Sequence, residues 1–328
     1  MMTRRRIIIA LGASALAAPL ASFAQQQPAK VAWIGFLGAE SASGYASRVE
    51  ALRTGLRDLG YAEGKNIVIE YRWAEGNYER LPGLAAELVR LKVDVIVTHG
   101  SVATRAAKQA TAAIPIVIGS TGDAVATGLV ASLAQPGGNI TGLTFFGREI
   151  SAKRLELLKE ALPRITQVAV LLNPANPAHR ATLESMEIAA RSLKLGLQPF
   201  EMVGPKEFES AFAAMAKKRV GAVAILEDAM FLANARRIAG LAAKHRLPLI
   251  GPKEYAEAGG LLAYGVNIPD MWRRAAVYVD KILKGAKPAD LPVERATRFE
   301  MVVNMKTAKA LGIKIPNSIL VRADKVIE

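Results

Sequence analysis

Short apolar runs alternate with longer stretches of helical spacing, and this alternation continues from Val31 nearly to the end of the chain. The apolar run at 31–37 precedes a helical pattern at 45–59 that ends before Gly60, and the run at 93–97 precedes another at 101–111. Apolar strands that are each followed by an amphipathic helix are typical of parallel sheets covered by helices. The pattern therefore predicts an α/β fold built on mostly parallel sheets.

The alternation occurs twice, and Gly137-Gly138 and an apolar segment at 140–146 separate the two halves. The 328 residues are enough for two domains, each with its own core. Further strands and a helix of the first half are expected at 66–71, 114–118 and 78–91. Helices of the second half are expected at 150–162, 178–195, 205–219 and 231–245, and its strands at 167–172, 198–203, 222–226, 247–250 and 261–264.

The C-terminal part adds a helix at 270–284, a strand at 299–304 and a short helix at 307–311. These elements exceed what the second sheet needs, so we expect most of them to return to the first domain. The predicted domains are thus a first lobe of 31–143 plus 268–328 and a second lobe of 144–267. Two doubly wound lobes joined by several crossings form a hinged pair, and the cleft at the carboxyl ends of their strands is the expected binding site.

The N-terminal residues have the pattern of a secretory signal peptide. Arg4-Arg5-Arg6 precede the apolar run from Ile7 to Leu20, and small residues stand at Ser22 and Ala24. This order predicts a signal peptide at 1–24, cleavage after Ala24 and a mature protein in the periplasm. The alternative is an uncleaved membrane anchor, which the short apolar run disfavours. No cysteine follows the run, so attachment through a lipid-modified N-terminal cysteine is excluded.

The chain is basic, with 43 Lys and Arg against 29 Asp and Glu and a net charge of +14. Removing the three arginines of the signal peptide leaves a charge of +11. The charges are spread over the predicted helices, and the longest run after the signal, Lys217-Lys218-Arg219, has no aromatic residues interleaved with it. This pattern favours solvated helix faces over nucleic-acid binding, and leaves a general attraction to acidic surfaces.

Residue composition limits the possible chemistry. The chain has no cysteine and only three histidines, His99, His179 and His245, none of them spaced as in a zinc-hydrolase helix. We therefore expect no metal and no cofactor. The nucleophile elbow, the phosphate-binding loop and the dinucleotide fingerprint are all missing from the sequence. A non-enzymatic protein is expected, although carboxylates near the cleft leave acid–base catalysis open.

Several segments together resemble a known protein family. They are Ile34-Gly35-Phe36-Leu37, Leu59-Gly60-Tyr61, Gly64-Lys65-Asn66-Ile67, Ala134-Gln135-Pro136-Gly137-Gly138-Asn139-Ile140-Thr141-Gly142, Gly259-Gly260-Leu261-Leu262-Ala263-Tyr264-Gly265, 275–285, 299–312 and Ala323-Asp324-Lys325-Val326-Ile327. The chain is similar in these segments to ABC-transporter substrate-binding proteins of the tryptophan/tyrosine-importer type. The resemblance covers nearly all of the mature chain. It implies the type I periplasmic binding fold, with two lobes on a three-segment hinge.

The resemblance also implies a function. A receptor of this type closes on a small organic ligand, for which an amino acid is expected and an aromatic one is an option, and delivers it to an ABC permease with its ATPase. We expect a monomer that meets the membrane only through the permease. The alternative is a binding protein that reports its ligand to a signalling receptor, and the sequence does not separate the two.

In the first lobe, candidate ligand contacts lie in the loops after three predicted strands. Ser101 follows the strand at 93–97 as a possible helix cap, and Ser120, Thr121 and Asp123 follow the strand at 114–118. The resemblance implies that these two loops hold the carboxylate and ammonium groups of an amino acid. Ser41 lies in a loop of small residues after the first strand. Each of them could instead serve only as a helix cap or turn residue.

In the second lobe, the corresponding loops supply Asn173, Asn176 and Asp228. Asp228 could pair with a ligand ammonium group, or it could cap the helix that follows. Phe145 is the preferred aromatic contact. Weaker candidates are Glu254, Phe146, Phe231 and Tyr264, while Trp33 and Trp272 are interpreted as structural residues and Trp73 is left unassigned.

Overall fold

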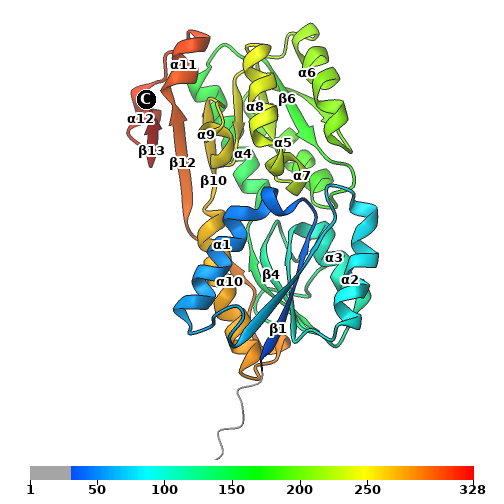
Figure 1. Cartoon of the computed structure of the whole chain (residues 1–328). Coiled ribbons are helices and arrows are strands. Elements are labelled where there is room, and N and C mark those ends of the chain that lie inside the picture. The colour runs from blue at the N-terminus through cyan, green and yellow to red at the C-terminus, as the bar shows by residue number, and fades with distance from the viewer. Residues whose placement is uncertain (1–30) are drawn as a thin grey trace, which may run out of the picture. The chain divides into compact units, whose positions relative to one another are not determined.

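Two parallel sheets dominate residues 31–328, the part of the chain that the computed structural model describes (Figure 1). The predicted signal peptide at 1–24 lies outside the described residues. The first sheet has the order β11-β5-β4-β3-β1-β2, and all of its neighbouring strands are parallel. Its strands are β1 (Ala32–Gly38), β2 (Ile67–Trp73), β3 (Val95–His99), β4 (Ile116–Thr121), β5 (Ile140–Thr144) and β11 (Glu294–Arg295).

The second sheet has the order β13-β12-β10-β9-β8-β6-β7, in which only the β10–β12 pair is antiparallel. Valine, leucine, isoleucine and alanine fill its central strands, which are buried on both faces. Its strands are β6 (Gln167–Leu172), β7 (Gly196–Glu201), β8 (Ala222–Ile225), β9 (Leu249–Gly251), β10 (Leu262–Val266), β12 (Phe299–Asn304) and β13 (Lys325–Ile327).

Helices cover both faces of each sheet, and four apolar clusters fill the spaces between them. The first sheet packs against α1 (Ala42–Asp58), α2 (Leu81–Arg90), α3 (Gly100–Ala110) and α10 (Ile268–Leu283), with the 3₁₀ turn η1 (Tyr78–Arg80) before α2. The second lobe contains α4 (Gly147–Ala161), α5 (His179–Ser192), η2 (Pro205–Glu207), α6 (Phe208–Lys217), α7 (Ala229–Ala233), α8 (Ala235–Lys244), α9 (Lys253–Glu257), α11 (Met305–Leu311) and α12 (Asn317–Leu320). The turn η3 (Pro288–Asp290) follows α10.

The C-terminal tail belongs mainly to the second lobe, so the predicted placement of 268–328 in the first lobe is wrong for its last part. Only α10 and β11 return to the first sheet, whereas β12 pairs with β10 and β13 pairs with β12. Met301 and Val303 of β12 point into the core of the second lobe together with Ala308 and Ile319. Burial of these apolar side chains stabilises the tail on the second sheet.

The chain crosses between the lobes at three places. One crossing connects β5 to α4, a second connects β10 to α10, and a third connects β11 to β12. The crossings also bond to each other or to the adjoining strand: the Ala296 N–H donates to the Thr144 carbonyl over 2.8 Å, and the Asn267 N–H donates to the Arg298 carbonyl over 3.1 Å. Three short neighbouring connections form a hinge about which two rigid lobes can rotate.

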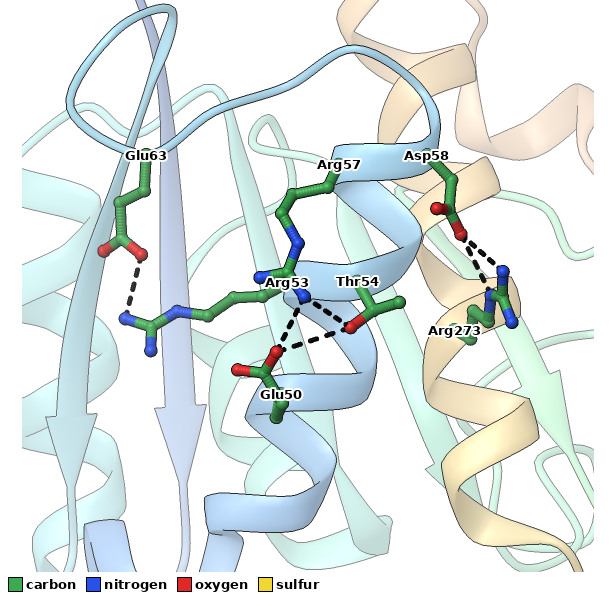
Figure 2. A network of polar contacts seen from close by, with 7 residues as sticks. All are labelled: Glu50, Arg53, Thr54, Arg57, Asp58, Glu63 and Arg273. Atoms are coloured by element: carbon green, nitrogen blue, oxygen red, sulfur yellow. Dashed lines mark hydrogen bonds and ion pairs between the residues drawn. The ribbon is translucent and has the colours of Figure 1, made fainter.

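The helices α1 and α10 pack closely along one face of the first sheet. A Cβ atom at Gly55 of α1 would lie 2.4 Å from the carbonyl oxygen of Arg273 in α10, so only glycine permits this approach. Figure 2 shows the ion pairs around it, in which Arg273 binds Asp58 over 2.6 Å and Arg53 binds Glu63 over 2.8 Å. The indole of Trp272 stacks on Phe36 of β1, with ring centres 5.4 Å apart.

One expected helix is divided. The sequence pattern predicts a single helix over 231–245, but α7 ends and α8 begins at Asn234, whose side-chain amide donates to the Met230 carbonyl over 2.9 Å. An asparagine that bonds to nearby backbone competes with helix continuation, and this explains the break. Of the helices between residues 31 and 328, none has the length and hydropathy needed to cross a bilayer.

Candidate functional site

A cavity of about 60 Å³ lies where the two lobes meet the hinge. Residues from both lobes line it, as do the first two crossings, which contribute Phe145, Gly147, Val266 and Ile268. The remaining lining residues are His99, Gly100, Ser101, Thr121, Gly122, Asn176, Ala178, His179, Thr182, Leu226, Glu227, Asp228, Ala229, Leu232 and Pro252. This position, beyond the carboxyl ends of both sheets, is the expected one for a ligand in such a fold.

The first-lobe wall consists of the start of α3 and the end of β4. His99 ends β3, and Gly100 adopts the left-handed backbone conformation (φ 74°) that turns the chain into α3. The hydroxyl groups of Ser101 and Thr121 lie 3.3 Å apart, and both residues are buried. A helix start beside two hydroxyl groups offers several hydrogen-bond donors to an anionic group.

His99 is a neutral member of this wall. Burial and the nearby Arg48 guanidinium lower its pKa well below the usual range. Its Nδ1 lies 2.9 Å from the Tyr45 hydroxyl. This hydrogen bond holds the orientation of the neutral ring, since a tyrosine hydroxyl can pair with either tautomer.

The second-lobe wall is centred on Asp228, which is only 6% exposed. Its Oδ1 accepts from the Tyr78 hydroxyl over 2.8 Å and from the Met230 N–H over 3.0 Å. Its Oδ2 accepts from the side-chain amide of Asn176 over 3.0 Å, and the Asn173 amide is 3.4 Å from both oxygens. All of these donors are neutral, and among residues 31–328 no cation forms an ion pair with Asp228. A buried carboxylate without a counter-ion favours a positively charged ligand group.

Glu227, next to Asp228, is neutralised by an arginine in the core. Arg154 is 1% exposed, and its Nη2 donates to Glu227 Oε1 over 2.6 Å. Its other nitrogens donate to the carbonyls of Tyr264 and Ile225, over 2.7 and 3.0 Å. Arg154 therefore connects a cavity-lining carboxylate to the strand β10 that leads into the hinge.

His179 holds the loop after β6 in place. The Asn173 N–H donates to its Nδ1 over 2.8 Å, so the ring hydrogen of the neutral form is on Nε2, which donates to the Glu227 carbonyl over 3.0 Å. The side chains of Asn173 and Asn176 also accept from the N–H groups two residues ahead, at Ala175 and Ala178. The loop is thus rigidly attached to the Asp228 segment.

Polar contacts cross from one lobe to the other around the cavity, among them a hydrogen bond from the Met230 N–H to the Tyr78 hydroxyl over 3.3 Å. The Tyr78 hydroxyl of the first lobe donates to Asp228, and burial together with the nearby carboxylate raises the Tyr78 pKa well above its ordinary value. Asp123 of the first lobe pairs with Arg148 of α4 over 2.9 Å. These contacts show that the lobes are closed on each other.

Apart from Thr182, the remaining side chains of the cavity wall are apolar. Phe145 is 4% exposed, and Leu226, Leu232, Pro252, Val266 and Ile268 complete this side. The cavity therefore combines polar groups with apolar surface, as expected for a site that binds an amphipathic molecule.

The structure places the predicted contacts in two groups. Ser101, Thr121, Phe145, Asn176 and Asp228 line the cavity, and Asn173 lies behind Asp228. Ser101 is in the first turn of α3 and is not its cap, which is His99. The residues that do not line the cavity are Ser41, which caps α1 by accepting from the Gly44 N–H, Ser120, whose buried Oγ has no partner among the described residues, and Asp123, which pairs with Arg148.

The weaker candidates lie in other surroundings. Phe231 is fully buried in the second-lobe core, Tyr264 stacks on Phe299, and the Arg295 guanidinium lies 3.7 Å above the Phe146 ring. Glu254 is in the first turn of α9. Trp73, which the sequence left unassigned, stacks on Tyr71.

Residue-type patterns did not reveal Tyr78, His179 or Glu227. The pattern around Tyr78 predicts only the start of a helix, and Glu227 stands beside Asp228, which has the more obvious capping pattern. The position of Glu227 shortly after an apolar strand does indicate a place in the site. Side chains at the carboxyl ends of parallel strands gather at the same edge of the sheet. No group of three or more metal-binding side chains is found within residues 31–328.

Comparison with known proteins identifies the family to which this fold belongs. The family model described as "ABC transporter substrate binding protein" matches residues 31–327. A protein of Clostridioides difficile (strain R20291) described as "Tyrosine-binding protein" is 26% identical over 261 residues, covering 79% of this chain and 74% of the relative.

Two solved structures resemble the whole described chain. A conserved domain protein from Vibrio cholerae is 29% identical with a TM-score of 0.85, over 90% of this chain and 100% of the other. An ABC domain from Streptococcus pneumoniae in complex with L-Trp is 25% identical with a TM-score of 0.84, over 90% of this chain and 99% of the other.

The family match and the two structures confirm the expected type I periplasmic binding fold, with two lobes on a three-segment hinge. They also confirm that the protein is a receptor for a small solute. With its fold, its interlobe cavity and a match that extends from residue 31 to residue 327, the chain belongs to the family of ABC transporter substrate-binding proteins.

Proposed function

We propose that this protein is a periplasmic receptor for an α-amino acid with an aromatic or large apolar side chain, which it delivers to an ABC permease. The observation that carries the proposal is the uncompensated, buried carboxylate of Asp228 opposite the polar start of α3, in a cavity with an apolar wall. The tyrosine-binding relative and the structure with L-Trp support the same ligand class.

The ligand carboxylate fits the first-lobe wall. The N–H groups at the start of α3 and the hydroxyl groups of Ser101 and Thr121 supply donors to it, and the helix dipole favours negative charge there. The neutral His99 adds no competing charge.

The ligand ammonium group fits the second-lobe wall. Glu227 already has Arg154 as its counter-ion, so Asp228 is the carboxylate that can pair with a new cation. The Oδ2 atom of Asp228 accepts only from side-chain amides and can accept one further donor. The ligand thus contacts both lobes, and this favours the closed state.

The ligand side chain then faces Phe145 and the aliphatic residues beside the hinge. Burial of a flat ring against Phe145 stabilises binding by the hydrophobic effect and by ring packing. The cavity of about 60 Å³ is smaller than the roughly 300–1,000 Å³ typical of small-molecule sites. The lobes must therefore separate to admit the ligand.

Delivery to a permease agrees with the family, whose members work outside the cytoplasm. The signal peptide expected at 1–24 supports the periplasm as the compartment. The same family match disfavours the alternative of a receptor that only reports its ligand to a signalling protein. We infer a binding role without catalysis, in which the contacts of the ligand with both lobes drive closure.

The proposal is tested with the chain from Gln25 onward, unfolded and refolded to remove any retained ligand. Thermal shift and calorimetry with the twenty amino acids should show binding of tryptophan, tyrosine or a similar apolar amino acid, because a ligand of the folded state raises its melting temperature. N-acetylated and amidated forms of the best ligand should bind more weakly, since each lacks one of the two charges. Absence of binding by any amino acid would overturn the ligand class.

The variants Ser101→Ala and Asp228→Asn test the two ends of the site. Each should weaken binding of the free amino acid by about 1–3 kcal/mol, since a buried polar contact is lost. Asp228→Asn should leave the affinity for the N-acetylated form unchanged. Ser192→Ala, at an exposed position at the end of α5, serves as the control and should bind like the parent. Equal affinities of all three variants would remove these residues from the site.

A further inference from the structure

Nine cations lie together at the end of the second lobe that is farthest from the cavity. The strands β6 to β10 run parallel, so the loops that precede them gather at one end, which is at the top in Figure 1. We call this set the basic end: Arg164, Arg191, Lys194, Lys217, Lys218, Arg219, Lys244, Arg246 and Lys314. Strands of six residues separate it from the cavity by about 20 Å.

The four loops of the basic end lack acids, and the acids that end the neighbouring helices α4 and α9, Glu160 and Glu257, are already paired with Arg322 and Lys325. The loops 162–166, 193–195, 218–221 and 245–248 contain no Asp or Glu. All nine side chains are exposed, and within residues 31–328 none of them forms an ion pair. Most other arginines of the lobe do form such pairs, as Arg237 does with Glu209 and Arg322 does with Glu160.

The basic end accounts for nearly all of the excess charge of the described chain. Residues 1–30 hold four of the 43 basic side chains and no acid, so residues 31–328 have ten more basic than acidic side chains. These cations are exposed, which agrees with the expected solvated faces, and they are concentrated at one end of the second lobe. The corresponding loops of the first lobe are balanced: Lys65 is accompanied by Glu63, and Lys92 by Asp94.

Local helix stabilisation explains only part of this pattern. A cation near a helix C-terminus interacts favourably with the helix dipole, which suits Lys194, Arg219 and Arg246. The same interaction with a helix dipole operates at Lys92 in the first lobe, but there the acid Asp94 follows two residues later. Arg164 and Lys314 share a groove with Arg219, of about 750 Å³, whose other lining residues include Leu162, Ile165 and Ile313. Cations from separate elements thus converge around a partly apolar surface.

We propose that the basic end binds the anionic phospholipid surface of the membrane in which the permease resides. A set of unpaired cations at one end of the lobe, three of them beside a partly apolar groove, complements a layer of phosphate headgroups. Such attraction is additive over the charges near the surface. The inference depends on one part of the proposed function, namely that the receptor works outside the cytoplasm beside a membrane. It holds for any ligand in the cavity.

Lipid headgroups suit this surface better than a nucleic acid does. Binding of single-stranded nucleic acid needs aromatic side chains on which bases can stack. Phe200 contacts one cation of the basic end. The Lys218 Nζ atom lies 5.3 Å from the centre of the Phe200 ring and covers the face on which a base would stack. A fluid layer of headgroups requires no such platform, because the attraction between cations and phosphate groups is electrostatic.

The experiment measures co-sedimentation of the chain from Gln25 onward with vesicles of phosphatidylglycerol or phosphatidylcholine, at low and high salt. The test variant combines Arg164→Gln, Lys194→Asn, Arg219→Asn and Arg246→Asn. Asparagine is used where φ is 53–54°, because it tolerates the left-handed conformation. The control removes four exposed first-lobe charges, by Lys65→Gln, Arg90→Gln, Lys92→Asn and Lys287→Gln.

The parent protein should bind phosphatidylglycerol and not phosphatidylcholine, and 0.5 M salt should abolish the binding. The test variant should lose about tenfold or more in affinity, and the control variant much less. Equal losses of vesicle affinity in the two variants would show that binding depends on the net charge of the protein and not on the basic end, and would overturn the proposal. So would no binding to phosphatidylglycerol, or binding to single-stranded RNA alone. Ligand affinity in the cavity should be the same in all three proteins, and this separates failure here from failure of the proposed function.

Discussion

At the scale of single residues, Glu40 connects the state of the cleft to pH. It is 6% exposed, and its Oε1 has no hydrogen-bond partner among the described residues. Burial, and then the carboxylates of Asp228 and Glu75, raise its pKa to about 8, against a smaller opposite effect of Arg48. The hydroxyls of Tyr78 and Tyr45 also face it. Asp228 belongs to the other lobe, so part of this shift arises only on closure.

Closure should therefore take up a proton at Glu40. A carboxyl group with a higher pKa in the closed state stabilises the closed state relative to the open state when it is protonated. This stabilisation is complete at pH values below the pKa of the open state, and it is lost as the pH rises toward about 8, the pKa in the closed state. Ligand affinity should fall across that interval and level off above it. Calorimetry in buffers of different ionisation enthalpy measures the proton uptake. Glu40→Gln should flatten the profile, whereas the exposed Glu75→Gln should largely keep it; identical profiles for the parent and Glu40→Gln would contradict the assignment.

The Tyr78 hydroxyl should stabilise the closed state. Tyr78→Phe removes the donor that reaches Asp228 Oδ1 over 2.8 Å, and we expect ligand affinity to drop by about 1–2 kcal/mol. Tyr61→Phe is the matched control, since its hydroxyl donates to Asp280 Oδ1 over 2.9 Å away from the cavity. Titration calorimetry should show a loss of affinity in the first variant only. A similar loss of affinity in both variants would mean that the Tyr78 hydroxyl affects binding only through the overall stability of the fold.

Sequence reasoning located the loops of the site better than its individual residues. Thr121 ends β4, and Ser101 and Asp228 lie within three residues of the ends of β3 and β8, so topology alone places them at the cleft. Ser41 was misplaced because a serine that caps a helix and one that binds a ligand have the same local pattern. Tyr78 escaped notice because its partner Asp228 is 150 residues away, and no local signal reports such a contact.

At the scale of elements, the contact between α1 and α10 depends on Gly55. In Gly55→Ala the new Cβ would lie 2.4 Å from the Arg273 carbonyl and 2.8 Å from the Ala276 Cβ, so the helices must move apart. We expect a loss of about 1–3 kcal/mol in the free energy of unfolding. In Gly240→Ala, inside α8, the Cβ meets nothing within 4 Å, and helix propensity should raise stability slightly. Denaturant unfolding measures both, and an unchanged stability of Gly55→Ala would contradict the close packing.

Most elements could be predicted because their apolar periodicity is strong. The tail could not, because β12 reads as an ordinary buried strand whichever sheet it joins. Its partner is decided by side chains such as Met301 and Val303, which fill a space in the second-lobe core. The break at Asn234 was also missed, since a single side-chain hydrogen bond outweighs the helical pattern there.

At the scale of the whole molecule, the three crossings predict a rotation of the two lobes about the hinge. Ligand contacts on both walls favour closure, so the radius of gyration in solution scattering should decrease when the amino acid is added. Glu40→Gln at high pH should close more readily than the parent, because it lacks the ionised carboxyl beside Asp228. A radius that stays the same at saturating ligand would exclude hinge closure.

The return of α10 to the first lobe also determines the order in which the protein can be assembled. The first sheet is encoded mostly by residues 32–144, but one of its faces is covered by a helix that ends only at residue 283. During synthesis, Phe36 and its neighbours remain without Trp272 until nearly the whole second lobe has been made. The core of the first lobe is therefore complete only after α10 has been synthesised, although most of its strands are made before residue 145.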